Sequence, residues 1–238
     1  MNTTIAQITY RGMLGSRRVF LLLGLPVLLL ALTGVLYALA SSPERVTILL
    51  MERFGVAMML PLLGLIVGTG VIGREIEDGV IMHLLAKPIR REVVSVTKLI
   101  VAASLMALFG ALPIFISAFA MMGWEADVAL GFAVGALAGG VAYAAVFLLI
   151  SIVTRFAVTV GIIYALIWEG VVGTVAPGAR DLSIQQWTLS IADAVSSSAF
   201  LKSQVAPGFA IPALIVTTLL ATILAGRRLR SLTLSGSE

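Results

Sequence analysis

Six apolar runs, each about as long as a membrane-spanning helix, constrain the fold of this chain more than any other feature. They cover residues 19–39, 54–72, 94–122, 128–153, 156–175 and 209–225. A helix needs about 20 residues to cross roughly 30 Å of hydrocarbon. A backbone in lipid must satisfy its own hydrogen bonds, and no alternation typical of a barrel is present. The sequence therefore predicts an all-α membrane protein with six transmembrane helices in a single domain, residues 1–238.

Composition and charge agree with this class and orient the spans. Apolar residues make up 60% of the chain and charged residues 12%, whereas soluble domains are about a quarter charged. With the amino terminus in the cytoplasm, twelve Lys and Arg residues fall on the cytoplasmic side and four on the outer side. Basic residues are enriched in cytoplasmic loops, so we expect both termini in the cytoplasm. The first apolar run is longer than a signal-peptide core and five more follow, which favours a retained anchor over a cleaved signal.

Three segments outside the apolar runs show helical patterns of their own. Residues 3–15 mix apolar residues with arginine, which predicts a short helix along the membrane surface. Ser41 and Glu44 have capping-box spacing, so the second helix is expected to begin beyond the membrane. Ser183 and Gln186 form a similar start before an apolar stripe. This last helix is too polar to span, and we expect it to cap the outer mouth or to dip into it.

Residues 73–92, between the second and third runs, are dense in charges of both signs. From Arg74 to Ala86 the apolar residues recur at i, i+4 spacing, which predicts an amphipathic helix. Its acidic residues lie at the amino end, where the helix dipole favours them. Pro88 ends it, because the residue before a proline is pushed out of the helical region. A short charged helix held between two spans is expected to contact another protein.

The chain offers little catalytic chemistry. His83 is its one histidine, which excludes an HExxH zinc motif and a serine–histidine pair at membrane depth. No GxxxxGK[ST] phosphate loop occurs, so the chain is not expected to hydrolyse ATP by that route. We therefore expect no enzyme, no catalytic residue, no metal site and no cofactor bound by this chain.

Glycines recur at helical spacing in two of the runs. Gly64 and Gly68 form a GxxxG pair, and three glycines are spaced by four from Gly131 to Gly139. Such spacing lets helix backbones approach closely, and packing within the chain is favoured over packing against a second copy. Residues 68–73 also fit GxGxxG, but they end a membrane helix and lack the strand that a dinucleotide site needs.

Charged and sulfur-containing side chains inside the runs give the remaining candidates. Glu169 marks a pathway or proton site, or it hydrogen-bonds the outer loop from a wet vestibule with Trp168 at the interface. The second interpretation is favoured. Lys98 and Arg155 lie near cytoplasmic ends, where their side chains can extend to the interface, and neither is assigned a functional role on this ground.

Several methionines lie toward the outer ends of the second and third runs, among them Met58 and Met59. Thioethers can bind Cu(I), but adaptable packing or a greasy substrate surface is favoured. Four residues are therefore candidates for a pathway or outer gate: Glu169, Trp168, Met58 and Met59.

The charged segment at residues 73–92, which we call the central segment, resembles the cytoplasmic loop of type-2 ATP-binding-cassette exporter permeases. The matching positions are Glu75, Glu77, Gly79, Leu84, Leu85, Pro88, Arg90 or Arg91, and Lys98. Val80 stands where the family often has threonine. Residues 164–170 and 177–183 resemble the fifth span and outer loop of the same family, and the span count also agrees.

The resemblance implies a half-transporter in a prokaryotic cell membrane. A second permease subunit, identical or a sister chain, would complete the pathway, and two cytoplasmic ATPase subunits would bind ATP and Mg²⁺. The family's coupling helix lies in the central loop, and the ATPase-coupling role carries over to Glu75, Glu77, Asp78, Gly79, His83 and Leu84. Two alternatives stay open: a stand-alone ion-coupled secondary transporter, and a non-transporting membrane assembly partner.

Overall fold

The computed structural model describes residues 3–15, 18–39, 43–77, 91–123, 126–172, 177–196 and 198–234. Within these ranges every regular element is helical, and no strand occurs. The α-helices are α1 (Thr3–Leu14), α2 (Arg18–Leu39), α3 (Pro43–Leu50), α4 (Leu60–Glu77), α6 (Arg91–Met106), α7 (Leu112–Met122), α8 (Ala126–Val153), α9 (Ala157–Ile163), α11 (Pro177–Arg180), α12 (Ile184–Val195) and α13 (Pro207–Leu234). Three wider π-helical segments are η1 (Met51–Met59), η2 (Ala107–Ala111) and η3 (Tyr164–Val172).

Five helical rods in the described part are long and apolar enough to cross a membrane. They are Val19–Leu39, Glu44–Ile72, Val93–Met122, Ala126–Val153 and Pro207–Arg230. They match five of the six predicted spans. The remaining run forms a shorter apolar helix, Ala157–Val171. Its described residues fall short of the roughly 20 that a span needs, so the prediction of a sixth span is not confirmed.

Two of the rods contain a π segment that ends two residues before a proline. Pro61 follows η1 and Pro113 follows η2. Proline lacks an N–H group, and its ring clashes with the carbonyl group four residues earlier in an α-helix. In both rods that carbonyl belongs to a widened turn, in which the N–H before the proline bonds to the carbonyl group five residues back. Both rods therefore continue through their prolines. The rod that contains η1 begins at Pro43, well before the apolar run 54–72, as predicted.

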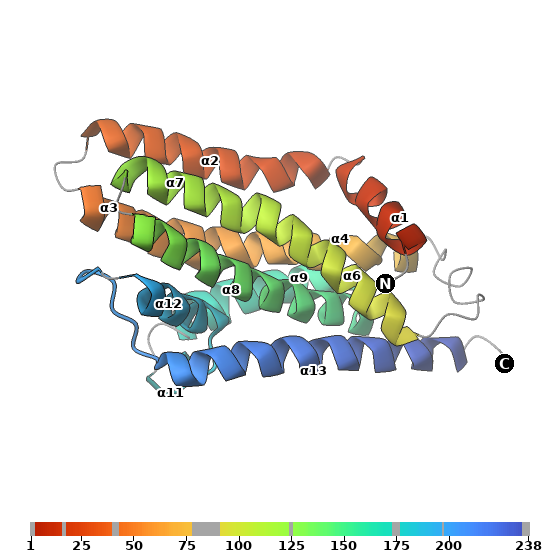
Figure 1. The fold of residues 1–238 in the computed structure, drawn as a ribbon. Coiled ribbons are helices and arrows are strands. Elements are labelled where there is room, and N and C mark those ends of the chain that lie inside the picture. Colours follow the sequence, from red (N-terminus) through yellow and green to blue (C-terminus); the bar gives the residue numbers. More distant parts are fainter. Residues whose placement is uncertain are drawn as a thin grey trace.

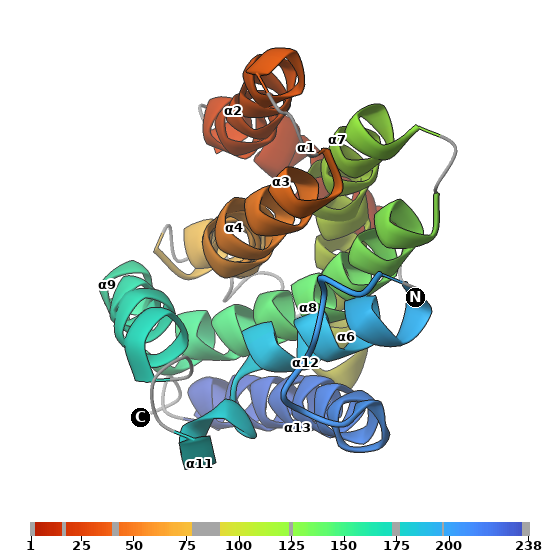
Figure 2. The same cartoon turned by 90° about the vertical axis from the view of Figure 1, so that its left-hand side faces the viewer.

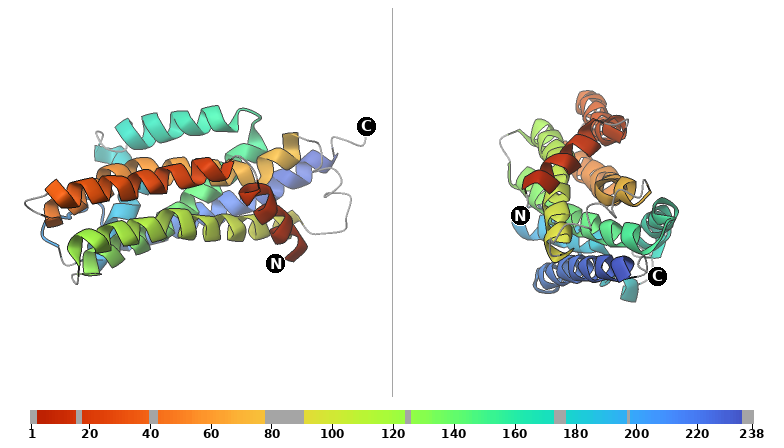
Figure 3. Two further views of the ribbon diagram at one scale, coloured as in Figure 1. Left: turned by 90° about the horizontal axis from the view of Figure 1, so that it is seen from above. Right: turned by 90° about the vertical axis from the view of Figure 1, so that its right-hand side faces the viewer.

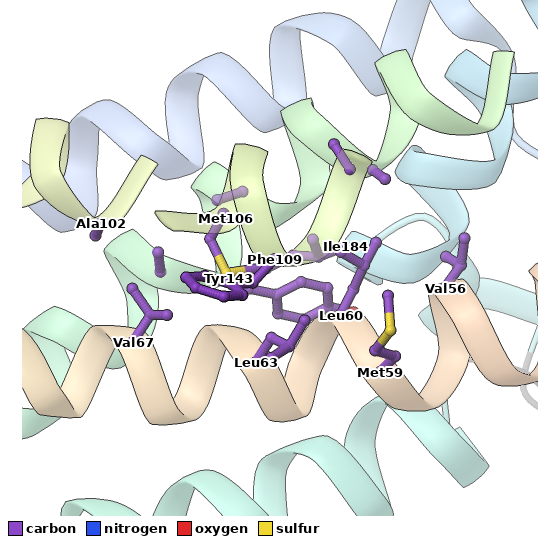
Figure 4. Packing of buried hydrophobic residues seen from close by; sticks show 14 of the residues in the cluster. Val56, Met59, Leu60, Leu63, Val67, Ala102, Met106, Phe109, Tyr143 and Ile184 are labelled. Carbon is purple, nitrogen blue, oxygen red and sulfur yellow. The ribbon is translucent and has the colours of Figure 1, made fainter. Parts of the chain in front are cut away.

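Helix α8 is the centre of the bundle (Figures 1 and 2), and α4, α6, α7, α12 and α13 all pack against it. Close packing against α4 depends on two glycines. A Cβ atom at Gly64 would lie 2.6 Å from the Tyr143 Cβ, and one at Gly68 would lie 2.7 Å from the Phe147 Cβ. The prediction that these glycines pack within the chain is confirmed. Figure 4 shows Leu60 and Leu63 of α4 beside the buried Tyr143 ring.

Helix α1 and the last turns of α13 lie at one end of the bundle, which we call the terminal end (Figure 1). We call the opposite end, where α3, α11 and α12 lie, the distal end. At the terminal end α1 crosses the bundle (Figure 3) and contacts α2, α4 and α6. The predicted helix at residues 3–15 is thus present, with Ile5 and Met13 buried. Its placement along a membrane surface stays a prediction.

At the distal end α12 enters the bundle and packs against α8 and α13. The α8 glycines make room for it. A Cβ atom at Gly131 would lie 2.5 Å from the Ala192 carbonyl oxygen, and one at Gly135 would lie 2.6 Å from the Thr188 carbonyl oxygen. The segment therefore dips into the bundle, which is one of the two arrangements that its polarity predicts.

Candidate functional site

Glu169 is fully buried at the distal end of the bundle, where η3 holds it. Its two carboxylate oxygens accept four hydrogen bonds. Oε1 accepts from the Tyr164 hydroxyl at 2.8 Å and from the Ile184 N–H at 3.1 Å. Oε2 accepts from the Ser183 hydroxyl at 2.5 Å and from the Gln185 N–H at 3.2 Å. Every donor but Tyr164 comes from the start of α12.

These hydrogen bonds supply acceptors for the N–H groups at the amino-terminal end of α12. The first N–H groups of a helix have no partner within it, and that end carries a partial positive charge. Glu169 accepts from two of these N–H groups and supplies a negative charge beside them. Ser183 accepts a third hydrogen bond from the Gln186 N–H at 3.3 Å, so the predicted cap at this position is confirmed. One carboxylate thus fastens η3 to α12.

The favoured interpretation of Glu169, a hydrogen bond to the loop, is confirmed in its contacts. The prediction that Glu169 lies in a wet vestibule is wrong, because its side chain has 0% exposure. Trp168 is half-buried and its Nε1 donates to the Leu182 carbonyl oxygen at 3.4 Å, so it fastens the same loop. The role of both residues in a pathway or gate stays a prediction.

The sequence gives a weak signal for Tyr164 as a partner of Glu169, because the two are five residues apart. In an α-helix, residues three and four apart share a face. A π-helix closes its hydrogen bonds at i, i+5 and brings residues with this spacing together. The π geometry of η3 therefore decides the pair, and no proline marks that segment in the sequence as one does after η1 and η2.

Tyr143 of α8 and Gln185 of α12 complete the buried polar cluster. Tyr143 is fully buried, its ring stacks on Phe147 with centroids 6.2 Å apart, and its hydroxyl lies beside Glu169 and Gln185. The Tyr143 hydroxyl is near the Glu169 carboxylate but does not meet it in hydrogen-bond geometry, and the Gln185 Oε1 has no hydrogen-bond partner among the residues that the structure describes. The cluster thus brings polar groups of α8, η3 and α12 together inside the bundle.

A second buried charge lies at the terminal end, where α1, α4 and α6 meet. Lys98 of α6 has 0% exposure. Its Nζ donates to the Val71 carbonyl oxygen of α4 and to the Thr9 hydroxyl of α1 at 3.5 Å. Lys98 does not extend to the interface, which its place near a predicted cytoplasmic end would allow, because α1 covers it. Lys98 instead joins α1, α4 and α6. The joined parts are the last turns of α4, which precede the central segment, and the first turns of α6, which follow it.

The helix α1 is held to α6 by a further contact. The Tyr10 hydroxyl hydrogen-bonds the Ser104 hydroxyl one turn and a half beyond Lys98. Together the two contacts make α1, α4 and α6 one packed unit at the terminal end.

The predicted coupling residues lie largely outside the described residues. Glu75 and Glu77 belong to α4 by their backbone, since α4 runs without a break to Glu77. The predicted separate helix therefore does not begin at Arg74. The other four, Asp78, Gly79, His83 and Leu84, lie outside the residues that the structure describes.

The methionine candidates do not share one surface. Met59 is fully buried beside Leu60 and Leu63 (Figure 4), whereas Met58 is about half exposed. Met51 and Met121 are also buried in the core. Among the described residues, no group of three or more His, Asp or Glu side chains is placed to hold a metal ion.

The chain was compared with known proteins. The family described as ABC-2 family transporter protein matches residues 3–232. The comparison with curated proteins finds no match.

Proposed function

The chain belongs to the ABC-2 transporter family, and we propose that it is the permease subunit of an ATP-driven exporter. In this proposal it forms half of the translocation pathway with a second permease subunit. Two cytoplasmic ATPase subunits, which bind ATP and Mg²⁺, supply the energy. The termini and the central segment face the cytoplasm of a cell membrane, so the distal end faces outward.

The observation that carries this proposal is the buried contact of Lys98 with α4 and α1. Lys98 is one of the positions at which the chain resembles the exporter permeases. It ties the helix that enters the central segment to the helix that leaves it, and it does so from a site with 0% exposure. A buried hydrogen bond from a charged group is worth about 1.5–3 kcal/mol. The helices α4 and α6 therefore move together when the segment between them is displaced.

The rods can carry such a displacement across the bundle. The helix α4 is continuous with η1 and α3, and α6 is continuous with η2 and α7, so each rod reaches from the terminal end to the distal end. Both rods pack against α8. When ATP binding closes the ATPase pair, a push on the central segment tilts both rods against α8. The ATPase contacts are assigned to Glu75, Glu77, Asp78, Gly79, His83 and Leu84.

Charge reversal in the central segment tests the proposal. The double variant Glu75→Lys/Glu77→Lys should still insert into the membrane but lose transport-coupled ATP hydrolysis in the assembled complex. Asp181→Lys, a charge reversal at an exposed distal residue, is the control and should keep normal coupling. Normal coupling in the double variant would contradict the assignment of this segment.

A pull-down from membranes tests the partner. Co-purification of a nucleotide-binding ATPase with the chain would support the exporter. Transport by the purified chain alone, driven by an ion gradient, would instead support a secondary carrier and refute the proposal. The structure gives the carrier little support, because Glu169, the acid inside an apolar run, is occupied by four donors at the start of α12.

A further inference from the structure

A polar cavity of about 260 Å³ lies at the distal end of the bundle. Its wall combines η1, α12, the last residue of α11 and the segment that leads into α13. The lining residues are Glu52, Arg53, Arg180, Gln185, Gln186, Leu189, Lys202, Ser203 and Gln204. Four parts of the chain that are far apart in sequence thus contribute to one site. A single water needs only about 10–15 Å³ of such space, so the cavity has room for a polar group of several atoms.

The charges of the lining residues favour an anion. Arg53, Arg180 and Lys202 are basic and Glu52 is acidic, so the formal balance is three positive charges against one negative. The Arg180 guanidinium donates to the Gln204 side-chain oxygen, which holds it at the cavity wall. Arginine presents planar, paired donors that match a phosphate group. Two net positive charges can balance a phosphate monoester, which carries about −1.5 to −2 near neutral pH, and they exceed the single negative charge of a phosphodiester.

The lining also contains acceptors that need a donor from the ligand. Gln185 is 5% exposed, and its Oε1 has no hydrogen-bond partner among the described residues. Its backbone N–H is held by Glu169, so its position is fixed by the buried cluster. Glu52 supplies a second acceptor. A bare anion would leave both acceptors facing negative charge, whereas a hydroxyl or ammonium group next to the phosphate would satisfy them.

We propose that this distal cavity binds a phosphate-bearing group that also carries a hydroxyl or an ammonium group. Arg53, Arg180 and Lys202 contact the phosphate, and Gln185 and Glu52 accept hydrogen bonds from the donor. Residues 52–53 and 202–204 of the lining come shortly before the apolar runs 54–72 and 209–225, so the cavity lies beside the ends of two predicted spans, where lipid headgroups are expected. Both a phospholipid headgroup and a soluble phosphate ester have this chemistry, and the experiment separates them.

The test measures binding to the full chain purified in detergent. The soluble arm uses inorganic phosphate and glycerol 3-phosphate, with heat change or thermal shift as the readout. The lipid arm uses mixed micelles with phosphatidylethanolamine, phosphatidylglycerol or phosphatidylcholine, with lipid retention in native mass spectrometry as the readout. The choline headgroup has a phosphate but no N–H or O–H donor. We expect preference for the ethanolamine and glycerol lipids over the choline lipid if the source is a lipid, and for glycerol 3-phosphate over phosphate if it is soluble.

Two variants connect binding to the cavity. Arg53→Gln/Lys202→Gln removes two exposed cations and should weaken binding about tenfold or more. Arg155→Gln/Arg227→Gln makes the same change in net charge at the terminal end and should change binding less than about twofold. Gln185→Leu keeps the backbone N–H that Glu169 holds, and it should reduce the preference for ligands with a donor.

Folding of each variant is checked by its melting temperature without ligand. Equal losses of binding affinity in the Arg53→Gln/Lys202→Gln variant and its control would overturn the proposal. Equal retention of all three lipids, together with no binding of glycerol 3-phosphate, would also overturn it. The result is independent of the exporter proposal, because it needs neither ATP nor a partner subunit.

Discussion

Replacing Glu169 by glutamine removes one charge and should loosen the start of α12. Each carboxylate oxygen accepts from one hydroxyl and one backbone N–H. An amide has only one oxygen, so its NH₂ group must face one of the two backbone donors. A hydroxyl can rotate to become an acceptor, but a backbone N–H cannot. Glu169→Gln therefore leaves one buried N–H without an acceptor, whichever way the amide is turned.

The size of the effect follows from these contacts. An orphaned buried donor costs about 1–3 kcal/mol, and hydrogen bonds to a charged group weaken from about 1.5–3 to about 0.5–1.5 kcal/mol when it becomes neutral. Burying a neutral amide costs less than burying a carboxylate, which offsets part of this loss. We expect a net destabilisation of about 2–4 kcal/mol. For a chain of this size, 1 kcal/mol lowers the melting temperature by roughly 2–4 °C, so the expected decrease is roughly 4–16 °C.

Tryptophan fluorescence during heating of the full chain in detergent gives the measurement. Trp168 lies in η3 and Trp187 in α12, and the Trp187 Nε1 donates to the Asp181 carbonyl oxygen at 3.0 Å, so both tryptophans report on this junction. Tyr164→Phe removes one of four donors and should cost about 1 kcal/mol. Asp181→Asn changes an exposed carboxylate nearby and should stay within about 0.5 kcal/mol. A melting temperature of Glu169→Gln equal to or above that of the unmodified chain would refute the capping role.

Three further substitutions test the packing. Lys98→Met removes the donor to Val71 and Thr9. It should lower the free energy of unfolding by about 1.5–3 kcal/mol and speed hydrogen exchange in α1. Unchanged exchange in α1 would contradict the three-helix contact. Gly68→Ala places a Cβ atom 2.7 Å from the Phe147 Cβ and 2.8 Å from the Ala144 carbonyl oxygen, so overpacking should lower stability by about 1–3 kcal/mol. Gly34→Ala is its control: an added Cβ atom there has no neighbour within 4 Å beyond its own stretch of helix, so the change should be neutral or stabilising by up to about 1 kcal/mol. Equal losses of stability in both variants would refute the close approach of α4 to α8. Ser183→Ala should cost about 0.5–2 kcal/mol, and its effect should not add to that of Glu169→Gln because the two share one network.

Features that depend on neighbouring residues were predictable from the sequence. Apolar runs of spanning length predicted all five rods, since hydrocarbon requires a helix wherever a long apolar run crosses it. The cap at Ser183 and the helix at residues 3–15 follow from side chains within a few positions of each other. The glycine pairs on α4 and α8 also followed, because spacing by four places them on one helix face. The family itself was recognised from the central segment together with the span pattern.

Only the tertiary structure decided the environment of the two buried charges. Lys98 reads as an interfacial residue until α1, almost ninety positions earlier in the chain, covers it. From the sequence alone Glu169 is expected to be partly exposed to water, whereas in the structure η3 directs it toward the first N–H groups of α12. The three cations of the distal cavity come from separate segments, and nothing in their local sequence brings them together. Local spacing determines which residues become helical, but the cost of burying a polar group depends on which distant donors and acceptors the packed helices bring to it.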